Sequence, residues 1–203
     1  MSPYVSPILD AKPQTAATKT GKGLSLWIVP PESYKPGSSL KELTTKAFPA
    51  YFRGSPHFVP HVTLTADIPE STRNLLSTMN LESTAPPIIE FGPLAYGEGF
   101  FNGIYLTINR TDSLLALVKH VREYINQVPP EDPSYGPHMS LAYVDKKPTA
   151  DQLRYVESEA ETAIGGSPGW KGGSVWLVDT SPIVTEWKIL ETFEFSGTTS
   201  PPG

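Results

Sequence analysis

The hydrophobic positions of this chain follow two periods, the two-residue repeat of strands and the longer repeat of helices. Residues 24–29 form an apolar run with β-branched and aromatic side chains, closed by Pro30 and Pro31, which predicts a buried strand. Residues 61–68 and 138–144 alternate apolar and polar positions, which is typical of strands with one packed face and one wet face. The pattern predicts two paired strands at 88–97 and 103–109, and two closing strands at 172–180 and 184–195.

Four segments between these strands have helical spacing. Ser39-Leu40-Lys41-Glu42 reads as a capping box that opens a helix to Phe48, and Thr149-Ala150-Asp151-Gln152 as another that opens a helix to Ile164. Residues 112–127 predict an amphipathic helix, and residues 70–80 a helix with Leu75, Leu76 and Met79 on its apolar face. Alternating strands interspersed with helices predict an α+β fold, whose exposed sheet face is available for a site.

Composition limits the protein class. The 203 residues carry a net charge of −5, which disfavours long polyanions as partners but leaves room for a small anionic ligand in a local pocket. The chain has no cysteine, so disulfides, thiol nucleophiles and cysteine-zinc sites are excluded. No stretch approaches the ~20 apolar residues of a membrane span, and the N-terminus lacks the features of a secretory signal. We therefore expect a soluble, intracellular and most simply cytoplasmic protein, with an N-terminal tail (1–22), one domain (23–196) and a C-terminal tail (197–203).

The candidate chemistry lies in two short motifs of the same form. His61-Val62-Thr63-Leu64 and His138-Met139-Ser140-Leu141 each follow a proline and each place a histidine two residues before a hydroxyl. On a strand both polar side chains point to one face, and the apolar residues between them point to the core. Two imidazoles across a cleft supply an acid and a base near neutral pH, while two hydroxyls can donate to phosphate oxygens. This set suffices, without a metal, to open a cyclic phosphodiester.

The other candidates have simpler readings. His57 is expected on a loop surface and His120 on a solvated helix face. A Gly-x-Ser-x-Gly sequence at 165–169 fails as a hydrolase elbow, because Pro168 has no N–H for an oxyanion hole. Arg53 and Arg73 are candidates for the border of the cleft, although most arginines simply face solvent. A histidine-based metal site lacks further ligands. Core or sheet-face positions are expected for Trp170, Trp176 and Trp187.

The two motifs resemble those of the two-histidine (2H) phosphoesterase superfamily, which is defined by a pair of His-Φ-Ser/Thr-Φ sequences in which Φ is hydrophobic. The stretch Ser-Leu-Trp-Ile-Val-Pro-Pro, with Trp27 and Pro30, is similar to the Trp-x-x-Pro signature of the fungal and plant cyclic phosphodiesterase branch, the 2′,3′-cyclic-nucleotide 3′-phosphodiesterases. Pro-His-Phe-Val-Pro-His-Val-Thr-Leu and the aromatic Tyr143 support the same branch. The resemblance covers residues 24–195.

The resemblance implies a bilobal fold, in which two antiparallel-sheet lobes with outer helices surround a central cleft. It implies His61 and His138 as the acid–base pair, Thr63 and Ser140 as phosphate donors, and Trp27 and Tyr143 as base or ribose contacts. The implied reactions open ADP-ribose 1″,2″-cyclic phosphate to the 1″-phosphate and nucleoside 2′,3′-cyclic phosphates to 2′-phosphates, linking the protein to tRNA-splicing by-products. We expect no cofactor, no metal and no long nucleic acid, and a monomer acting on a small molecule. The alternatives are an RNA-end-processing phosphodiesterase and a non-catalytic cyclic-nucleotide-binding module.

Overall fold

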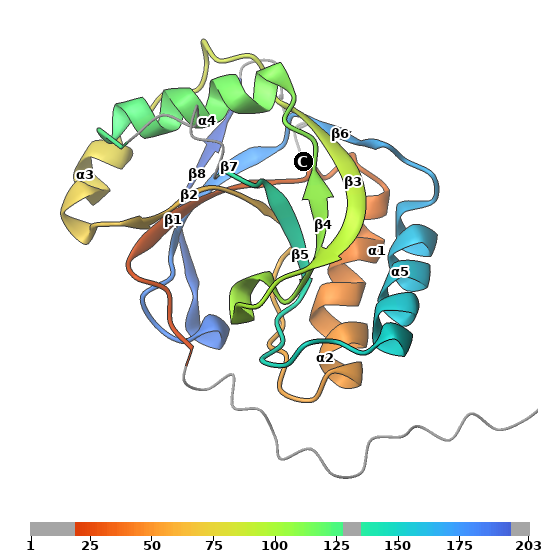
Figure 1. Ribbon diagram of the computed structural model, residues 1–203. Helices are drawn as coiled ribbons and strands as arrows, with labels where there is room; N and C mark the ends of the chain where they lie inside the picture. The colour runs from red at the N-terminus through yellow and green to blue at the C-terminus, as the bar shows by residue number, and fades with distance from the viewer. Residues whose placement is uncertain (1–18, 128–134, 196–203) are drawn as a thin grey trace, which may run out of the picture.

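A single curled antiparallel sheet of eight strands organises the protein (Figure 1). The computed structural model describes residues 19–127 and 135–195. The strand order is β6-β3-β4-β5-β2-β1-β7-β8. The strands are β1 (Leu24–Val29), β2 (Val62–Ile68), β3 (Ile88–Tyr96), β4 (Ile104–Ile108), β5 (His138–Ala142), β6 (Gly169–Lys171), β7 (Ser174–Asp179) and β8 (Lys188–Glu194).

The sheet consists of two four-stranded halves that meet between β2 and β5. The β5 lobe contains β6, β3, β4 and β5, and the β2 lobe contains β2, β1, β7 and β8. The central strands β2 and β5 pair through one residue pair, Val62 with Met139, whereas β1 pairs with β7 along its whole length. The predicted α+β fold with two antiparallel lobes is therefore confirmed, although the lobes are continuous with each other through this narrow join.

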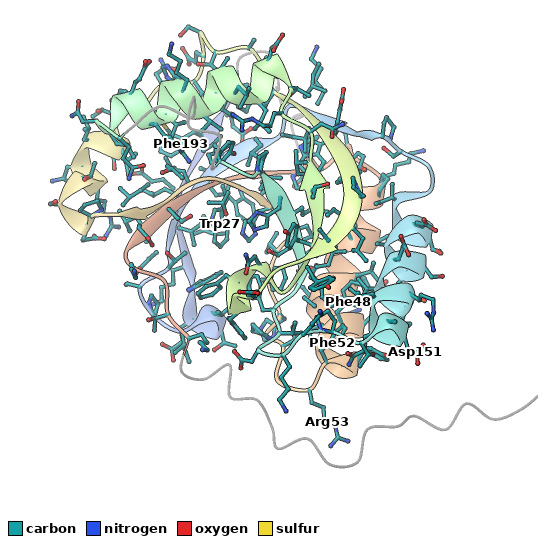
Figure 2. The ribbon with its side chains drawn as sticks, in the orientation of Figure 1. Trp27, Phe48, Phe52, Arg53, Asp151 and Phe193 are labelled. Carbon is teal, nitrogen blue, oxygen red and sulfur yellow. The ribbon has the colours of Figure 1, made fainter. Side chains whose placement is uncertain are left out.

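Helices cover the outside of the sheet. They are α1 (Pro36–Glu42), α2 (Phe48–Tyr51), α3 (Arg73–Leu76), α4 (Asp112–Tyr124) and α5 (Ala150–Ile164). Figure 1 shows α4 above the sheet, where it contacts β2 and β3, while α1 packs beside α5 on the flank of the β5 lobe. Buried side chains such as Phe48 and Phe52 lie between these helices and the sheet, and Trp27 lies inside the curve of the sheet (Figure 2).

The start of the first helix differs from the sequence prediction. The helix begins at Pro36, three residues before Ser39, and continues through a π-helical turn (Leu43–Ala47) into α2. Proline at the first helical turn needs no hydrogen-bond donor and has its φ already fixed, so it begins the helix without a side-chain cap. The capping box predicted at Thr149 is confirmed, since Thr149 and Gln152 exchange side-chain and backbone hydrogen bonds.

Two further predicted elements are shorter than expected. The helix expected at 70–80 is a 3₁₀ turn (Glu70–Thr72) followed by α3, and Leu75 is 41% exposed. The hydroxyls of Ser77 and Thr78 bond to backbone carbonyls of the preceding turn, which competes with helix continuation. The closing strand expected from residue 184 starts at Lys188, because Val184–Glu186 form another 3₁₀ turn. The three-residue β6 carries no readable pattern and was not predicted.

The chain begins to pack against the sheet before β1. Thr20 forms a β-bridge with Ile183, and the Gly21 N–H donates to the Thr180 carbonyl at 2.8 Å. A side chain on Gly21 would collide with Thr180, so the close approach requires glycine. Residues 19–22, which the sequence assigned to the tail, therefore belong to the folded body. Residues 1–18 of the predicted N-terminal tail, residue 196 of the predicted domain and the whole predicted C-terminal tail (197–203) lie outside the described residues.

Candidate active site

The join between the lobes brings the two histidine motifs together. Val62 and Met139 pair across it, and both side chains are fully buried in the core. Extending this antiparallel register by one residue in each direction places His61 opposite Ser140 and Thr63 opposite His138. Side chains of a strand alternate between faces, so all four polar groups lie on the face opposite the core. Each histidine therefore lies across from the hydroxyl of the other motif.

The backbone orients both imidazoles in the same way. The Nδ1 atom of His61 lies 2.6 Å from the Val59 carbonyl, and that of His138 lies 3.0 Å from the Gly136 carbonyl. A carbonyl only accepts, so each Nδ1 carries the proton and donates it, which leaves each Nε2 available to exchange a proton with a ligand. The intervening prolines restrict the residue before them to extended conformations, which helps to turn these carbonyls toward the histidines.

The His61 side chain is enclosed by aromatic rings. It is 6% exposed, and its ring stacks on that of Trp27 with centroids 3.7 Å apart and planes 12° from parallel. The Trp27 indole N–H donates to the Ser25 hydroxyl at 2.7 Å, which in turn donates to the Thr65 carbonyl. Burial lowers the pKa of His61 to about 4; the hydrogen bond to Val59 opposes this shift, and the nearby His138 adds to it. His61 is therefore neutral at pH 7 in the unliganded protein.

The second motif has a more open environment. His138 is half-buried, and its ring is tilted against Tyr105 at a centroid distance of 4.9 Å. Ser140 is buried and donates its hydroxyl to the Phe101 carbonyl at 3.1 Å. Tyr143 is also buried, and burial raises its pKa far above the ordinary value, although a hydrogen bond with the Ser140 side chain opposes this. Tyr143 is therefore a permanently protonated phenol.

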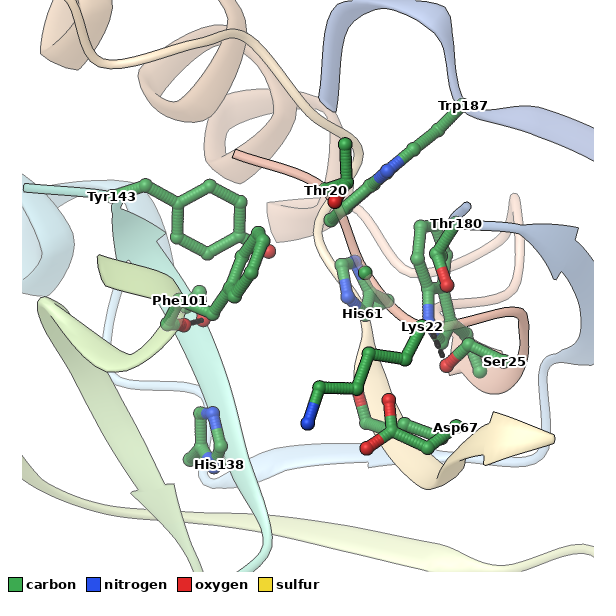
Figure 3. Close-up of a pocket in the computed structure, with 15 residues that line it drawn as sticks. Thr20, Lys22, Ser25, His61, Asp67, Phe101, His138, Tyr143, Thr180 and Trp187 are labelled. Carbon is green, nitrogen blue, oxygen red and sulfur yellow. Dashed lines mark hydrogen bonds between the residues drawn. The ribbon is translucent and has the colours of Figure 1, made fainter. Parts of the chain in front are cut away.

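All six residues singled out from the sequence line one pocket of about 370 Å³ (Figure 3). This volume suits a small-molecule ligand. The two histidines project into the pocket from opposite sides, His61 from the β2 lobe and His138 from the β5 lobe. The full lining comprises Thr20, Gly21, Lys22, Ser25, Trp27, His61, Thr63, Ala66, Asp67, Phe101, His138, Ser140, Tyr143, Thr180 and Trp187.

Several residues that line the pocket were not predicted from the sequence. Trp187 was expected in the core or on a sheet face, but it is half-buried at the pocket wall, with Phe101 stacked on it at 5.8 Å. Its position depends on the 3₁₀ turn before β8, which no local pattern announced. Lys22 and Asp67 supply the charged groups of the lining besides the histidines. Lys22 lies just before β1 and Asp67 near the end of β2. Both reach the same pocket because those two strands pair in antiparallel register.

Other candidates lie away from the pocket. Arg53 and Arg73 do not line the pocket, and the solvent-facing alternative holds for them; Arg53 is exposed near α2 (Figure 2), and Arg73 forms an ion pair with Glu70. His57 is exposed on its loop, as predicted. The prediction for His120 was wrong: it is half-buried, its Nε2 is shielded from solvent, and its ring lies 6.4 Å from that of Tyr124. Charged sequence neighbours did not reveal that the ring turns inward.

The described residues contain neither a cluster of metal ligands nor a membrane-spanning helix. Within 19–127 and 135–195, no group of three or more histidine, aspartate or glutamate side chains converges in a way that could hold a metal ion. No helix in this part of the chain has the length and apolarity needed to cross a bilayer. What the pocket offers chemically is thus two proton-transfer groups, two hydroxyl donors and an aromatic wall.

Curated relatives share this chain over most of its length. A 2′,3′-cyclic-nucleotide 3′-phosphodiesterase from Phaeosphaeria nodorum is 29% identical over 187 residues, covering 83% of this chain and 96% of the relative. A protein of the same name from Yarrowia lipolytica is 26% identical, covering 85% of this chain and 100% of the relative. The matches therefore span whole relatives rather than one shared segment.

Solved structures show the same fold. A conserved protein of unknown function from Agrobacterium tumefaciens aligns with a TM-score of 0.58 at 14% identity, covering 88% of this chain and 89% of its own. LigT from E. coli, solved in complex with phosphate, aligns with a TM-score of 0.51 at 11% identity, covering 88% and 99%.

The family assignment rests on a match that spans the folded body and both motifs. The model of the cyclic phosphodiesterase-like protein family matches residues 22–195, which include the whole of the sheet. The relatives, the fold and the paired motifs agree with it. The chain therefore belongs to the cyclic phosphodiesterase-like family of two-histidine phosphoesterases, and it is an enzyme of the cyclic phosphodiesterase class.

Proposed function

We propose that this protein hydrolyses small cyclic phosphates, namely nucleoside 2′,3′-cyclic phosphates to 2′-phosphates and ADP-ribose 1″,2″-cyclic phosphate to the 1″-phosphate. The observation that carries the proposal is the crossed arrangement of His61, Ser140, Thr63 and His138 around the single Val62–Met139 pair. The names of the curated relatives support the first substrate class. Both substrates contain a strained five-membered ring with one phosphorus and one leaving ribose oxygen.

The two histidines supply the proton transfers. One imidazole takes a proton from water through Nε2 as the water oxygen attacks phosphorus, and the other, protonated, gives a proton to the departing ribose oxygen. In a 2′,3′-cyclic substrate the P–O3′ bond breaks, so the phosphate stays on O2′ and the 3′-hydroxyl is regenerated. General acid–base catalysis of this kind contributes about 10²–10⁴-fold in rate. Each histidine donates its Nδ1–H to a backbone carbonyl, and these two bonds orient both rings with Nε2 available for the proton exchange.

The two hydroxyls supply charge stabilisation. Thr63 and Ser140 lie across from the opposite histidines, where they can donate to the non-bridging oxygens on which charge grows in the transition state. In the unliganded protein Ser140 donates to the Phe101 carbonyl, so ligand binding requires this hydroxyl to rotate toward phosphate. The mechanism uses no group beyond these side chains and water.

The aromatic wall supports a nucleobase or ribose contact. Trp27 and Tyr143 both line the pocket, but His61 covers one face of Trp27, and Phe58 covers one face of Tyr143 at 4.1 Å. Phe101 and Trp187 also stack on each other, at 5.8 Å, but both are only half-buried and so leave more aromatic surface exposed in the same pocket. We therefore place the base against Phe101 and Trp187, where stacking contributes about 1–3 kcal/mol, with Trp27 and Tyr143 beside the reacting groups.

The pocket favours a small ligand over a long strand. Its volume of about 370 Å³ suits a small molecule. The net charge of −5 opposes a long polyanion, and Lys22 is the one fixed cation among the described residues that line the pocket. The products proposed here would place the enzyme downstream of reactions that leave cyclic phosphates, such as tRNA splicing.

The test is turnover of both cyclic phosphates in EDTA and ¹⁸O-labelled water, with products identified by phosphorus NMR. We expect a 2′-phosphate from the nucleoside substrate, a 1″-phosphate from the ADP-ribose substrate, and one ¹⁸O atom in each phosphate. A short oligonucleotide ending in a 2′,3′-cyclic phosphate tests the RNA-end alternative, and we expect slower turnover of it. Absence of turnover, dependence on added metal or a 3′-phosphate product would each contradict the proposal.

A further inference from the structure

The join between the two lobes is too short to explain how the site keeps its geometry. Within the described sheet, β2 and β5 pair through Val62 and Met139, yet the proposed chemistry needs the residues on both sides of that pair to stay aligned. Backbone pairing elsewhere in the β2 lobe is extensive, since β1 pairs with β7 through all six of its residues. A single strand pair leaves most of the alignment of the two lobes to side-chain packing, including that of α4, which contacts both β2 and β3.

Beside the two motifs themselves, contacts between the lobes come from the residue three positions before each histidine. The sequences are Phe58-Val59-Pro60-His61 and Tyr135-Gly136-Pro137-His138. The Phe58 ring stacks on Tyr143, which follows β5, with centroids 4.1 Å apart and planes 17° from parallel. The Tyr135 hydroxyl donates to the Thr63 carbonyl in β2 at 3.1 Å. Each aromatic residue thus starts beside one motif and contacts the strand of the other.

The Tyr135 contact lies where strand pairing stops. Thr63 follows Val62, the last β2 residue paired with β5, so the phenol bonds to the backbone one residue beyond that pair. The ring is held by the Arg122 guanidinium at 4.8 Å from its centroid, and the Tyr135 carbonyl accepts from Arg110 at 3.2 Å. Burial raises the pKa of Tyr135 well above its ordinary value despite these arginines, so the hydroxyl remains a donor.

Phe58 is anchored to the helical segment that packs against α5 and β5. Its side chain is 7% exposed, and its carbonyl accepts from the buried Thr44 hydroxyl at 2.8 Å, which ties it to the first helical segment. Its ring also meets the edge of His61 at 6.3 Å. Neither Phe58 nor Tyr135 lines the pocket, so neither touches a ligand bound there.

We propose that Phe58 and Tyr135 are reciprocal positioning residues, which brace the two lobes against each other and fix the separation of His61 and His138. The inference rests on the proposed function for its kinetic readout but not for its structural one. Because neither residue contacts the pocket, loss of a brace should misalign the reacting groups while leaving the ligand contacts in place. Such a loss lowers kcat and spares KM, since small displacements at a site are costly mainly in the transition state.

Conservative variants test each brace against a matched control. Tyr135→Phe keeps the ring and its Arg122 contact and removes only the hydroxyl; Tyr124→Phe removes a comparable hydroxyl, which bonds to Thr78 at 2.7 Å far from both motifs. Phe58→Leu is matched by Phe52→Leu, which is equally buried and packs on Tyr51. We expect kcat to fall about tenfold in Tyr135→Phe and Phe58→Leu with KM within about twofold, and both controls to stay near wild type.

A distance measurement provides a readout that does not depend on activity. The chain has no cysteine, so spin labels can be attached to cysteines introduced at Glu157 on α5, which flanks the β5 lobe, and at Thr192 on β8 in the β2 lobe. We expect a narrow distance distribution in wild type and in both controls, and a broader one in the two brace variants. The shift in the distribution reports lobe separation directly.

The two readouts separate the possible failures. Unchanged distance distributions in Tyr135→Phe and Phe58→Leu, or kinetic losses no larger than those of Tyr124→Phe and Phe52→Leu, would overturn the brace. A wild type that shows no turnover but whose brace variants broaden the distribution would overturn the proposed function and leave the brace supported. A rise in KM with unchanged kcat would also contradict positioning, because it would indicate lost ligand contacts.

Discussion

The two histidine motifs have the same sequence form but different surroundings. His61 is 6% exposed and stacks face to face on Trp27, whereas His138 is half-buried and meets Tyr105 at a tilt. Both donate Nδ1–H to the carbonyl two residues earlier, so backbone orientation is shared and only the side-chain surroundings differ. A repeated motif therefore fixes how the two imidazoles point, while the rest of each lobe decides how deeply each imidazole is buried.

The largest expected effect tests what the two motifs share. We expect His61→Ala and His138→Ala each to lower kcat by about 10² to 10⁴-fold, because each removes one of the two proton-transfer groups. The double variant should lose little more than either single one, since the groups act as a unit. Steady-state kinetics with a 2′,3′-cyclic nucleotide measure the losses, with His57→Ala on the exposed loop as control.

A variant that retained wild-type kcat would show that its histidine takes no part in the reaction. Losses that multiplied in the double variant would show instead that the two imidazoles act in separate steps.

The next effect tests what the motifs do not share. Burial holds His61 neutral, with its pKa at about 4 against an ordinary 6.5, so the unfolded chain takes up its proton at a higher pH than the folded one. The free energy of unfolding is therefore independent of the titration of His61 above pH 6.5. It falls as the pH drops from 6.5 toward 4, by a total of about 3 kcal/mol. Urea unfolding across this range should show that His61→Gln loses correspondingly less stability than wild type.

His57→Gln provides the control for this difference, because His57 is exposed. Parallel pH profiles for wild type and His61→Gln would contradict the assignment of the acid sensitivity to this histidine.

The smallest expected effect compares the aromatic neighbours. Trp27→Phe removes part of the ring stacked on His61 and its indole bond to Ser25, while Tyr105→Leu removes the tilted ring beside His138. We expect the first to raise the pKa of His61 toward its ordinary value and to lower kcat/KM about fivefold, as befits one aromatic contact. Histidine NMR titration measures the pKa of His61, and steady-state kinetics measure kcat/KM. If Tyr105→Leu changed both quantities as much as Trp27→Phe does, the expected difference between the two aromatic neighbours would be contradicted.

Local patterns were enough for most of the fold. The strands at 24–29, 61–68 and 138–144 and the helix beginning after Thr149 were predictable because periodicity and capping act over a few residues. The failures have local causes too. Pro36 began the first helix before the apparent capping box, and hydroxyl-to-backbone bonds at Ser77 and Thr78 stopped α3 after one turn. The sequence did not predict the element boundaries at which two local preferences compete, namely the start of the first helix and the end of α3.

For the site, the sequence identified the groups but not their surroundings. The doubled motif gave His61, Thr63, His138 and Ser140, because both occurrences lie within a few residues. The one-pair join at Val62 and Met139 depends on long-range pairing, and so does the arrival of Trp187 at the pocket wall. The spacing of residues along the chain does not predict either of these long-range contacts. The lowered pKa of His61 was hidden for the same reason, since Trp27 reaches it through pairing between strands.

The placement of β1 between β2 and β7 has a consequence for the order of folding. Residues 24–29 are all buried and pair on one side with β2 and on the other with residues 174–179, which are synthesised about 145 residues later. During synthesis this strand remains an apolar edge, with Trp27 in it, until most of the chain has left the ribosome. Contacts between such distant segments fold slowly. A chain that stops before β7 therefore leaves β1 as an apolar edge that favours aggregation, and it lacks the Thr180 and Trp187 side chains of the pocket lining.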